Sequence, residues 1–85
     1  MSREITISNE LGMHARPAAE FVRKAGSFRS EITLVKDDHR FLATSVIDIL
    51  RANLERGATA TLEAHGPDAA EAVEALARLL GEMRG

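Results

Sequence analysis

The sequence predicts an α+β two-layer sandwich in which four strands and three helices follow one another in the order βαββαβα. Two observations lead to this fold class. Four segments alternate polar and apolar residues with the period of a strand, and three others carry apolar residues at helical spacing. Clusters of Gly, Pro, Asn and Asp separate these segments. Such a chain buries its apolar faces when the helices cover one face of a four-stranded antiparallel sheet.

The first strand is expected over residues 3–8, where Ile5 and Ile7 fall on one face. The sequence NELG then interrupts the alternation. A helix is expected from Pro17, whose missing N–H costs nothing in a first turn. Gly26 is placed to end this helix in the left-handed conformation. The inward stripe of the helix is expected to consist of Ala18, Phe21, Val22 and Ala25.

The middle of the chain predicts a β-hairpin followed by a short helix. Strands at residues 30–36 and 41–43 flank the polar turn DDHR. Thr44 or Ser45 can cap the helix that follows. The inward residues are expected to be Ile32 and Leu34 in the first of these strands, and Val46, Ile49 and Leu50 in the helix. Ile47 is left pointing away from that helical stripe.

The last third of the chain predicts one more strand and a longer helix. The strand covers residues 58–64, and Pro67 and Asp68 in the break that follows are good starters for a helix. The strand is expected to turn Ala60, Leu62 and Ala64 inward. The helix is expected to bury Ala70, Val73, Ala77 and Leu80, with Leu76 beside them. Because the sequence has no repeat, linker or low-complexity stretch, residues 1–85 are expected to form a single domain.

The composition argues against several classes of protein. The 85 residues include no Cys, which rules out disulfides and thiolate metal sites and suits a reducing cytoplasm. No apolar run approaches the roughly 20 residues of a membrane-spanning helix, and the charged, alternating N-terminus is unlike a signal peptide. The formal net charge is -2, whereas a nucleic-acid-binding domain usually carries a basic surplus. We therefore expect a cytoplasmic protein that neither inserts into a membrane nor binds nucleic acid.

The stretch LGMHARPAAEF, residues 11–21, carries the strongest indication of chemistry. His14 lies about where the helix cap or the first helical residue would be, where unpaired N–H groups and the helix dipole favour an anion. Arg16 adds a fixed cation whose fork geometry suits phosphate. Together they predict phosphoryl transfer through a covalent phosphohistidine, and Gly12 allows close backbone approach beside it. The alternative is an ordinary surface histidine or a weak helix cap.

The segment LGMHARPAAEFV closely resembles the active-site segment of the HPr family, the histidine-containing phosphocarriers of the bacterial phosphoenolpyruvate-dependent phosphotransferase system. The segments TSVIDIL and ERGATATLEAHGPDAAEAVEALARLL resemble the second helix, last strand and last helix of the same family, in the same order. The resemblance covers essentially the whole chain. It implies an open-faced βαββαβα sandwich, in agreement with the pattern of strands and helices.

The resemblance implies roles for three residues of the motif. His14 would be the phosphoacceptor through its Nδ1 atom, Arg16 would neutralise and orient the phosphoryl group, and Pro17 would start the helix so that free N–H groups face the site. Enzyme I would supply the phosphoryl group, and IIA-type domains would accept it for sugar uptake. By this resemblance the protein is a transfer intermediate and not an enzyme, needs no metal or organic cofactor, and is expected to be a monomer.

The resemblance also implies an apolar docking surface beside His14. The matching residues are Val46, Ile47 and Leu50, together with Ala15, Ala19 and Arg23 from the first helix. Val46 and Leu50 have the spacing of core residues, and for Leu50 the two alternatives are even. For Ile47 the interface is favoured, because exposed apolar groups beside a functional site indicate a partner surface.

Ser45 falls where some members of the family carry a regulatory serine that a dedicated kinase phosphorylates and a phosphatase restores. The alternative is a simple helix cap. The residue type of Asp48 differs from the one that many members of the sugar branch carry at this position, and its charge would repel a phosphoserine. TSVIDIL also resembles the nitrogen-branch paralogue of the family, in which the carrier serves regulation, so both branches stay open.

Three other interpretations fit parts of the sequence. A small-molecule-sensing βαββαβ module without phosphotransfer explains the fold but leaves His14 and Arg16 unexplained. A nucleic-acid-binding α+β domain conflicts with the acidic pI and the lack of exposed stacking aromatics. A purely allosteric docking partner is weakly opposed by the same histidine and arginine. His39 and His65 lie in predicted turns, where no spacing favours a metal site.

Overall fold

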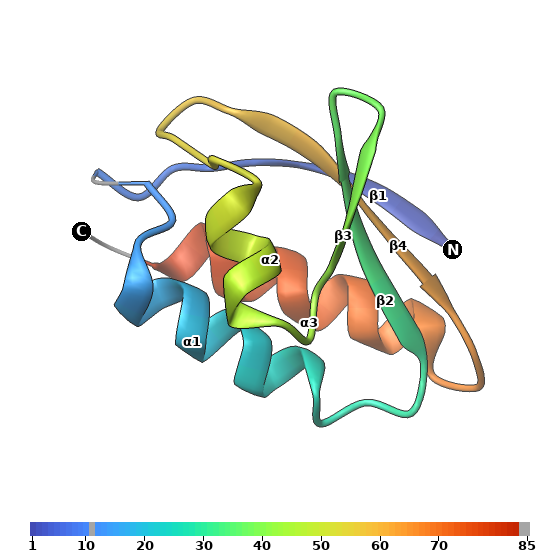
Figure 1. Cartoon of the computed structure of the whole chain (residues 1–85). Coiled ribbons are helices and arrows are strands. Elements are labelled where there is room, and N and C mark those ends of the chain that lie inside the picture. Colours follow the sequence, from blue (N-terminus) through green and yellow to red (C-terminus); the bar gives the residue numbers. More distant parts are fainter. Residues whose placement is uncertain (11, 84–85) are drawn as a thin grey trace.

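The computed structural model describes residues 1–10 and 12–83. Its elements are β1 (Ser2–Thr6), α1 (Ala15–Ala25), β2 (Glu31–Lys36), β3 (His39–Leu42), α2 (Val46–Arg51), β4 (Thr59–His65) and α3 (Ala69–Glu82). This order confirms the predicted βαββαβα arrangement. The strands form one sheet in the order β1-β4-β2-β3, and every neighbouring pair is antiparallel. All three helices lie on one side of this sheet, which gives the predicted open-faced sandwich (Figure 1).

The registers of the strands place their apolar residues on the face that the helices cover. Ile5 of β1 lies opposite Ala60 of β4, and Leu62 of β4 lies opposite Leu34 of β2. All four of these side chains are buried. Thr59 and Glu31, the first residues of β4 and β2, are exposed. Because successive residues of a strand point to opposite faces, the alternation in the sequence is sufficient to fix which face packs.

The core between sheet and helices is almost entirely aliphatic. Its largest fully buried apolar side chains are Ile7, Phe21, Leu34, Ile49, Leu62, Leu76 and Leu80. Each contributes through the area removed from water, about 25 cal/mol per Å². Every residue predicted to face inward in the first, second and fourth strands is buried, which confirms the period-two assignments.

The first helix differs from the prediction at both ends. It begins at Ala15, two positions before Pro17, because the first intrahelical hydrogen bond runs from the Ala18 N–H to the His14 carbonyl at 2.9 Å. Pro17 is therefore still in the first turn, where no N–H is needed. The expected left-handed stop at Gly26 is wrong. Gly26 keeps right-handed torsions (φ -68, ψ -12), and its N–H donates to the Val22 carbonyl at 2.9 Å.

The hairpin turn between β2 and β3 is shorter than predicted. Asp37 and Asp38 both adopt left-handed torsions, with φ of 51 and 65, as a two-residue turn of type I′ requires. His39 therefore belongs to β3, and His65 is the last residue of β4. The prediction that these two histidines lie in turns is wrong.

The last helix buries a different stripe from the one predicted. Val73, Leu76 and Leu80 are buried as expected, but Ala70 is exposed and Ala72 takes the buried place. The error arises because α3 has alanines on several faces, and alanine alone carries little information about which face packs. Ala77 is half-buried against the core.

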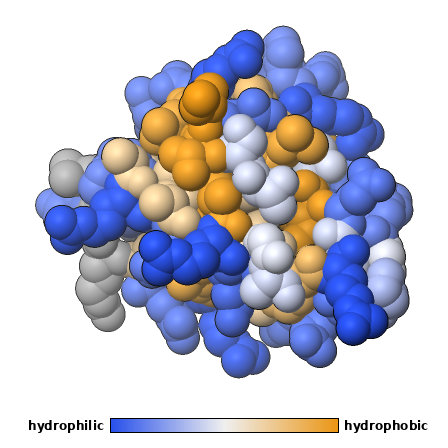
Figure 2. All heavy atoms as spheres, turned by 60° about the horizontal axis from the view of Figure 1, so that its bottom comes forward, coloured by the Kyte–Doolittle hydropathy of each residue, from blue (hydrophilic) through white to orange (hydrophobic). Residues whose placement is uncertain are grey.

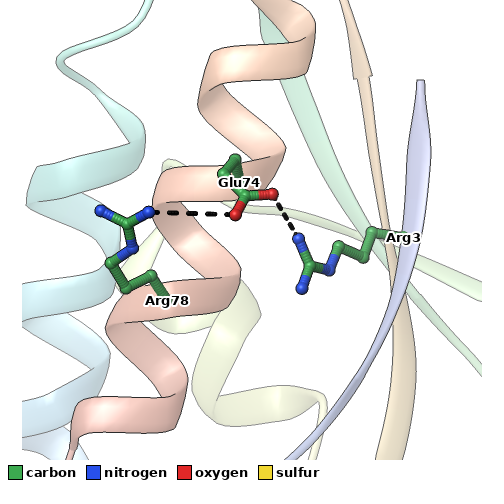
Figure 3. Close-up of polar contacts among 3 residues, drawn as sticks. All are labelled: Arg3, Glu74 and Arg78. Atoms are coloured by element: carbon green, nitrogen blue, oxygen red, sulfur yellow. Dashed lines mark hydrogen bonds and ion pairs between the residues drawn. The ribbon is translucent and has the colours of Figure 1, made fainter.

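Two polar contacts join α3 and its N-cap residue to segments that are distant in sequence. Arg3 of β1 forms an ion pair with Glu74 of α3 (Figure 3). Glu74 Oε1 also lies 4.0 Å from Nη2 of Arg78, one turn further along the helix. These side chains are exposed, so the pairs add little stability. A tighter contact is made by Asp68, the N-cap residue of α3. Its carboxylate accepts hydrogen bonds from the Ser30 hydroxyl (2.6 Å), the Ser30 N–H (2.9 Å) and the Arg29 N–H (2.9 Å).

The Asp68 carboxylate therefore fastens the start of α3 to the residues before β2 and does not cap its own helix. The Ser30 hydroxyl first, then the Arg29 and Ser30 amides, hold the pKa of Asp68 below its ordinary value of 3.8. All of these hydrogen bonds favour the ionised carboxylate over the protonated acid.

The stability supplied by Asp68 should depend on pH. Because the pKa is lower in the folded state than in the unfolded chain, the stabilisation is present above the ordinary value of 3.8 and is lost as the pH falls through the folded-state pKa. Urea unfolding of Asp68→Asn should show a lower free energy of unfolding than the parent at pH 7, and the difference should shrink with acid. Glu71→Gln, in the exposed first turn of α3, is the control and should leave the free energy of unfolding at pH 7 close to the parental value.

Candidate functional site

His14 is the N-cap residue of α1 and is exposed. Its backbone is extended (φ -98, ψ -170), and its carbonyl accepts the first intrahelical hydrogen bond. The donor of that bond is Ala18, so the N–H groups of Ala15 and Arg16 come before it in the chain, and Pro17 has no N–H group. The first turn contains no acidic residue, so the positive end of the helix dipole is not neutralised within the helix. The imidazole thus stands at the amino end of a helix, as the sequence predicted.

The backbone that leads into His14 is in close contact with the segment after α2. Gly12 has φ +72, and a Cβ built on it would lie 2.8 Å from the Leu54 carbonyl oxygen. The next residue, Met13, is buried and donates its N–H to the same carbonyl at 2.7 Å. The close backbone approach expected at Gly12 is therefore confirmed, and its partner is Leu54.

Arg16 is exposed in the first turn of α1 and borders a shallow hollow beside Pro17. The other walls of the hollow are Glu20 and, from the far end of the chain, Glu82 and Met83. Among residues 1–10 and 12–83, no carboxylate lies within ion-pair distance of the Arg16 guanidinium. Its cation is consequently available to an anion that approaches the amino end of α1.

The residues expected to form the docking surface lie on α1 and α2, which pack side by side. Ile47 is 70% exposed and Leu50 41% exposed, while Val46 is half-buried against the core. On α1, Ala15 and Arg23 are exposed and Ala19 is half-buried. Apolar atoms gather in the middle of the helical face and hydrophilic groups surround them (Figure 2).

The exposure of the residues in α2 decides whether Leu50 lies in the core or on the surface. Ile49 is the only residue of this six-residue helix that is fully buried. The prediction that Leu50 faces inward is wrong, because a helix this short turns only one narrow stripe toward the sheet. Leu50 and Ile47 therefore both present apolar surface to solvent.

Of the two residues predicted as possible caps, Ser45 and not Thr44 is the N-cap residue of α2. Its hydroxyl oxygen accepts a hydrogen bond from the Asp48 N–H at 3.2 Å. The Asp48 carboxylate in turn accepts one from the Leu42 N–H at 2.9 Å. The structure thus gives Ser45 a capping role and uses Asp48 to hold the connection from β3.

The histidines at the ends of β3 and β4 do not join this site. Within the part of the chain that the structure describes, no group of three or more His, Cys, Asp or Glu residues could hold a metal ion. None of the described helices is both long enough and apolar enough to cross a membrane.

Comparison with known proteins identifies the family. A family model described as the PTS HPr component phosphorylation site matches residues 1–82. The chain belongs to the HPr family. The phosphocarrier protein HPr of Cupriavidus necator is 35% identical over 85 residues, which cover 100% of this chain and 96% of the relative. The phosphocarrier protein NPr of Shewanella violacea is 38% identical over 80 residues, which cover 94% of this chain and 88% of that one.

A solved HPr has the same fold. The crystal structure of HPr-C-His from Thermoanaerobacter tengcongensis matches with a TM-score of 0.92 and 38% identity, covering 95% of this chain and 91% of that one. Other solved structures of the family are described as dimers.

One residue near the site was not singled out by the sequence. The sequence marks Asn9 only as a turn former after the first strand, yet its side chain is buried and its Nδ2 donates to the Gly12 carbonyl at 2.8 Å. Asparagine is so common in turns that nothing in the sequence alone distinguishes a buried side chain from an exposed one.

The contact between Gly12 and Leu54 can be tested against a matched glycine. Gly12→Ala should lower the free energy of unfolding by about 3 kcal/mol, from left-handed strain and the clash together. Gly57 also has a left-handed torsion (φ +88), but nothing lies within 4 Å of its added Cβ. Gly57→Ala should therefore cost only about 1–2 kcal/mol of strain. Equal losses in urea unfolding would contradict the close approach at Gly12.

Proposed function

We propose that this protein is a phosphocarrier that accepts a phosphoryl group on Nδ1 of His14 from phospho-enzyme I and passes it to IIA-type domains. The observation that carries the proposal is the exposed imidazole at the amino end of α1, in a chain of the HPr family. The proposal includes a cytoplasmic, monomeric carrier that works without metal or organic cofactor.

The transfer needs a nucleophile, a cation and hydrogen-bond donors at one place. A lone pair on Nδ1 attacks phosphorus, and the bond between phosphorus and the donor breaks as the new N–P bond forms. The Arg16 guanidinium and the amides of Ala15 and Arg16 at the first turn of α1 stabilise the phosphoryl oxygens. Pro17, which has no N–H, keeps the first turn in helical form without adding another donor. The second transfer reverses these steps, so the protein is a carrier and not an enzyme.

The docking surface of Val46, Ile47, Leu50, Ala15, Ala19 and Arg23 would receive both partners in turn. Exposure of Ile47 and Leu50 supports this role, because large apolar side chains in solvent contribute little to the fold. Arg23 and Arg16 add positive charge at its border, which suits a partner whose site is acidic.

The sugar branch is our first assignment, with the nitrogen-branch regulatory carrier as the alternative. The relatives named HPr and NPr are similar to this chain to nearly the same degree, at 35% and 38% identity. Phosphorylation of Ser45 by a serine kinase remains the weaker part of the proposal. Its hydroxyl already caps α2, and the Asp48 carboxylate stands three residues away. Membership of the HPr family disfavours the small-molecule-sensing module.

The site assignment predicts one phosphoryl adduct. Incubation with enzyme I, phosphoenolpyruvate and magnesium should give an acid-labile, base-stable adduct, which mass spectrometry should place on His14. His14→Ala should abolish it, whereas His39→Ala and His65→Ala, at exposed strand histidines, should leave it unchanged. An adduct that survives His14→Ala would refute the assignment. Transfer onward to a sugar-branch or a nitrogen-branch IIA domain then distinguishes the two branches.

The docking surface predicts a loss of transfer without a loss of stability. Ile47→Asp should reduce kcat/KM for transfer from phospho-enzyme I about tenfold or more, because a charge is buried at the interface. Its free energy of unfolding should change by no more than about 0.5 kcal/mol, as for other surface substitutions. Leu42→Asp is the control: Leu42 is 58% exposed, on β3, outside the proposed surface. Equal losses of transfer in both variants would contradict the assignment of this surface.

A further inference from the structure

A buried amide lies next to the candidate phosphoryl site. Asn9 is only 1% exposed, although it belongs to the connection between β1 and α1 and not to a strand or helix. Its Nδ2 donates to the Gly12 carbonyl at 2.8 Å, and the Gly12 N–H donates back to the Asn9 carbonyl at 2.9 Å. These two reciprocal hydrogen bonds tie Asn9 directly to Gly12.

The Gly12 carbonyl also connects Asn9 to His14. The His14 N–H donates to that same oxygen at 3.2 Å. A single carbonyl therefore accepts from the side chain of Asn9 and from the backbone of the proposed phosphoacceptor. The amide of Asn9 is thus separated from His14 by one shared acceptor.

The peptide plane before Met13 is held from two sides. Met13, between Gly12 and His14, is fixed by its own hydrogen bond to Leu54. The Gly12 carbonyl and the Met13 N–H belong to the same peptide plane, so this plane is held on one side by Leu54 and on the other by Asn9. Loss of the Asn9 donor leaves the plane held from one side only, and the backbone of His14, whose N–H donates to the same carbonyl, loses part of its support.

The hydrogen bond to Gly12 satisfies only one end of the Asn9 amide. Asn9 Oδ1 is buried and, among the described residues, has no hydrogen-bond partner. A buried acceptor without a partner is unfavourable for stability. A polar side chain that is retained at such a cost is typical of residues that support a functional site.

We propose that Asn9 is a positioning residue for phosphoryl transfer, which holds the Gly12 carbonyl and through it the orientation of His14. The inference rests on the proposed function, in which His14 accepts the phosphoryl group. Asn9 does not touch the reacting atoms, and it is not part of the docking surface. Its loss should consequently change the rate of the transfer step and leave partner affinity intact.

The first measurement is the kinetics of transfer from phospho-enzyme I. Asn9→Ala should lower kcat about tenfold with KM unchanged, since small misplacements of a reacting group cause losses of this order or more. Val73→Ala, a core substitution in α3 that should lower the melting temperature, is the matched control and should transfer normally when folded. Transfer by Asn9→Ala at the parental rate, or equal losses in the two variants at equal folded fraction, would overturn the inference.

The second measurement does not require any phosphoryl transfer. Backbone order parameters of the Gly12 and His14 amides, measured by ¹⁵N relaxation, should fall in Asn9→Ala and stay at parental values in Val73→Ala. If the parent protein takes no phosphoryl group, the proposed function fails and this measurement still decides whether Asn9 orders the turn. Unchanged order at His14 in Asn9→Ala would overturn the positioning role.

Discussion

The candidate site depends on one contact, in which the Gly12–Met13 backbone lies directly against Leu54. The Met13 N–H donates to the Leu54 carbonyl at 2.7 Å, and Gly12 has no side chain to hold the two segments apart. This contact joins the segment that enters α1 to the segment that leaves α2. The amino end of α1, which presents His14, is therefore held in a defined position relative to the end of α2. Under the proposed function, a partner that docked on α2 would meet the imidazole at a defined place, so little ordering would be left for the moment of binding.

Much of this arrangement could be predicted because it follows from local rules. Alternation fixed the inward faces of β1, β2 and β4, and the Ser45 cap and the His14 motif marked where two helices begin. The errors occurred where local pattern is ambiguous. Leu50 has the spacing of a core residue, yet α2 is too short to bury more than Ile49 completely. Asn9 looks like any turn residue, and only the path of the chain decides that its amide turns inward.

Polar groups at the edges of the core have a consistent role in this fold. Asp68 fastens the start of α3 to Ser30, just before β2, and Asn9 holds Gly12 before α1. Each lies in a connection between elements, where backbone N–H and carbonyl groups have no partner in a helix or sheet. Buried backbone groups of this kind must find partners, and side chains supply them here. Because a hydrogen bond also fixes direction, these residues determine the angles at which the helices meet the sheet, which hydrophobic contacts alone specify less sharply.

The same reasoning applies to α2, which a six-residue sequence could not stabilise by helix propensity alone. Its amino end is held by the Ser45 hydroxyl and by the bond from the Leu42 N–H to Asp48, and at its other end Lys36 Nζ donates to the Ala52 carbonyl at 3.0 Å. With both ends fastened and Ile49 buried, Ile47 can remain exposed without loosening the helix. A phosphate on Ser45 would have to replace the hydroxyl that caps the helix while facing the nearby carboxylate of Asp48. Like charges at that distance oppose each other, so the structure favours Ser45 as a cap over Ser45 as a switch.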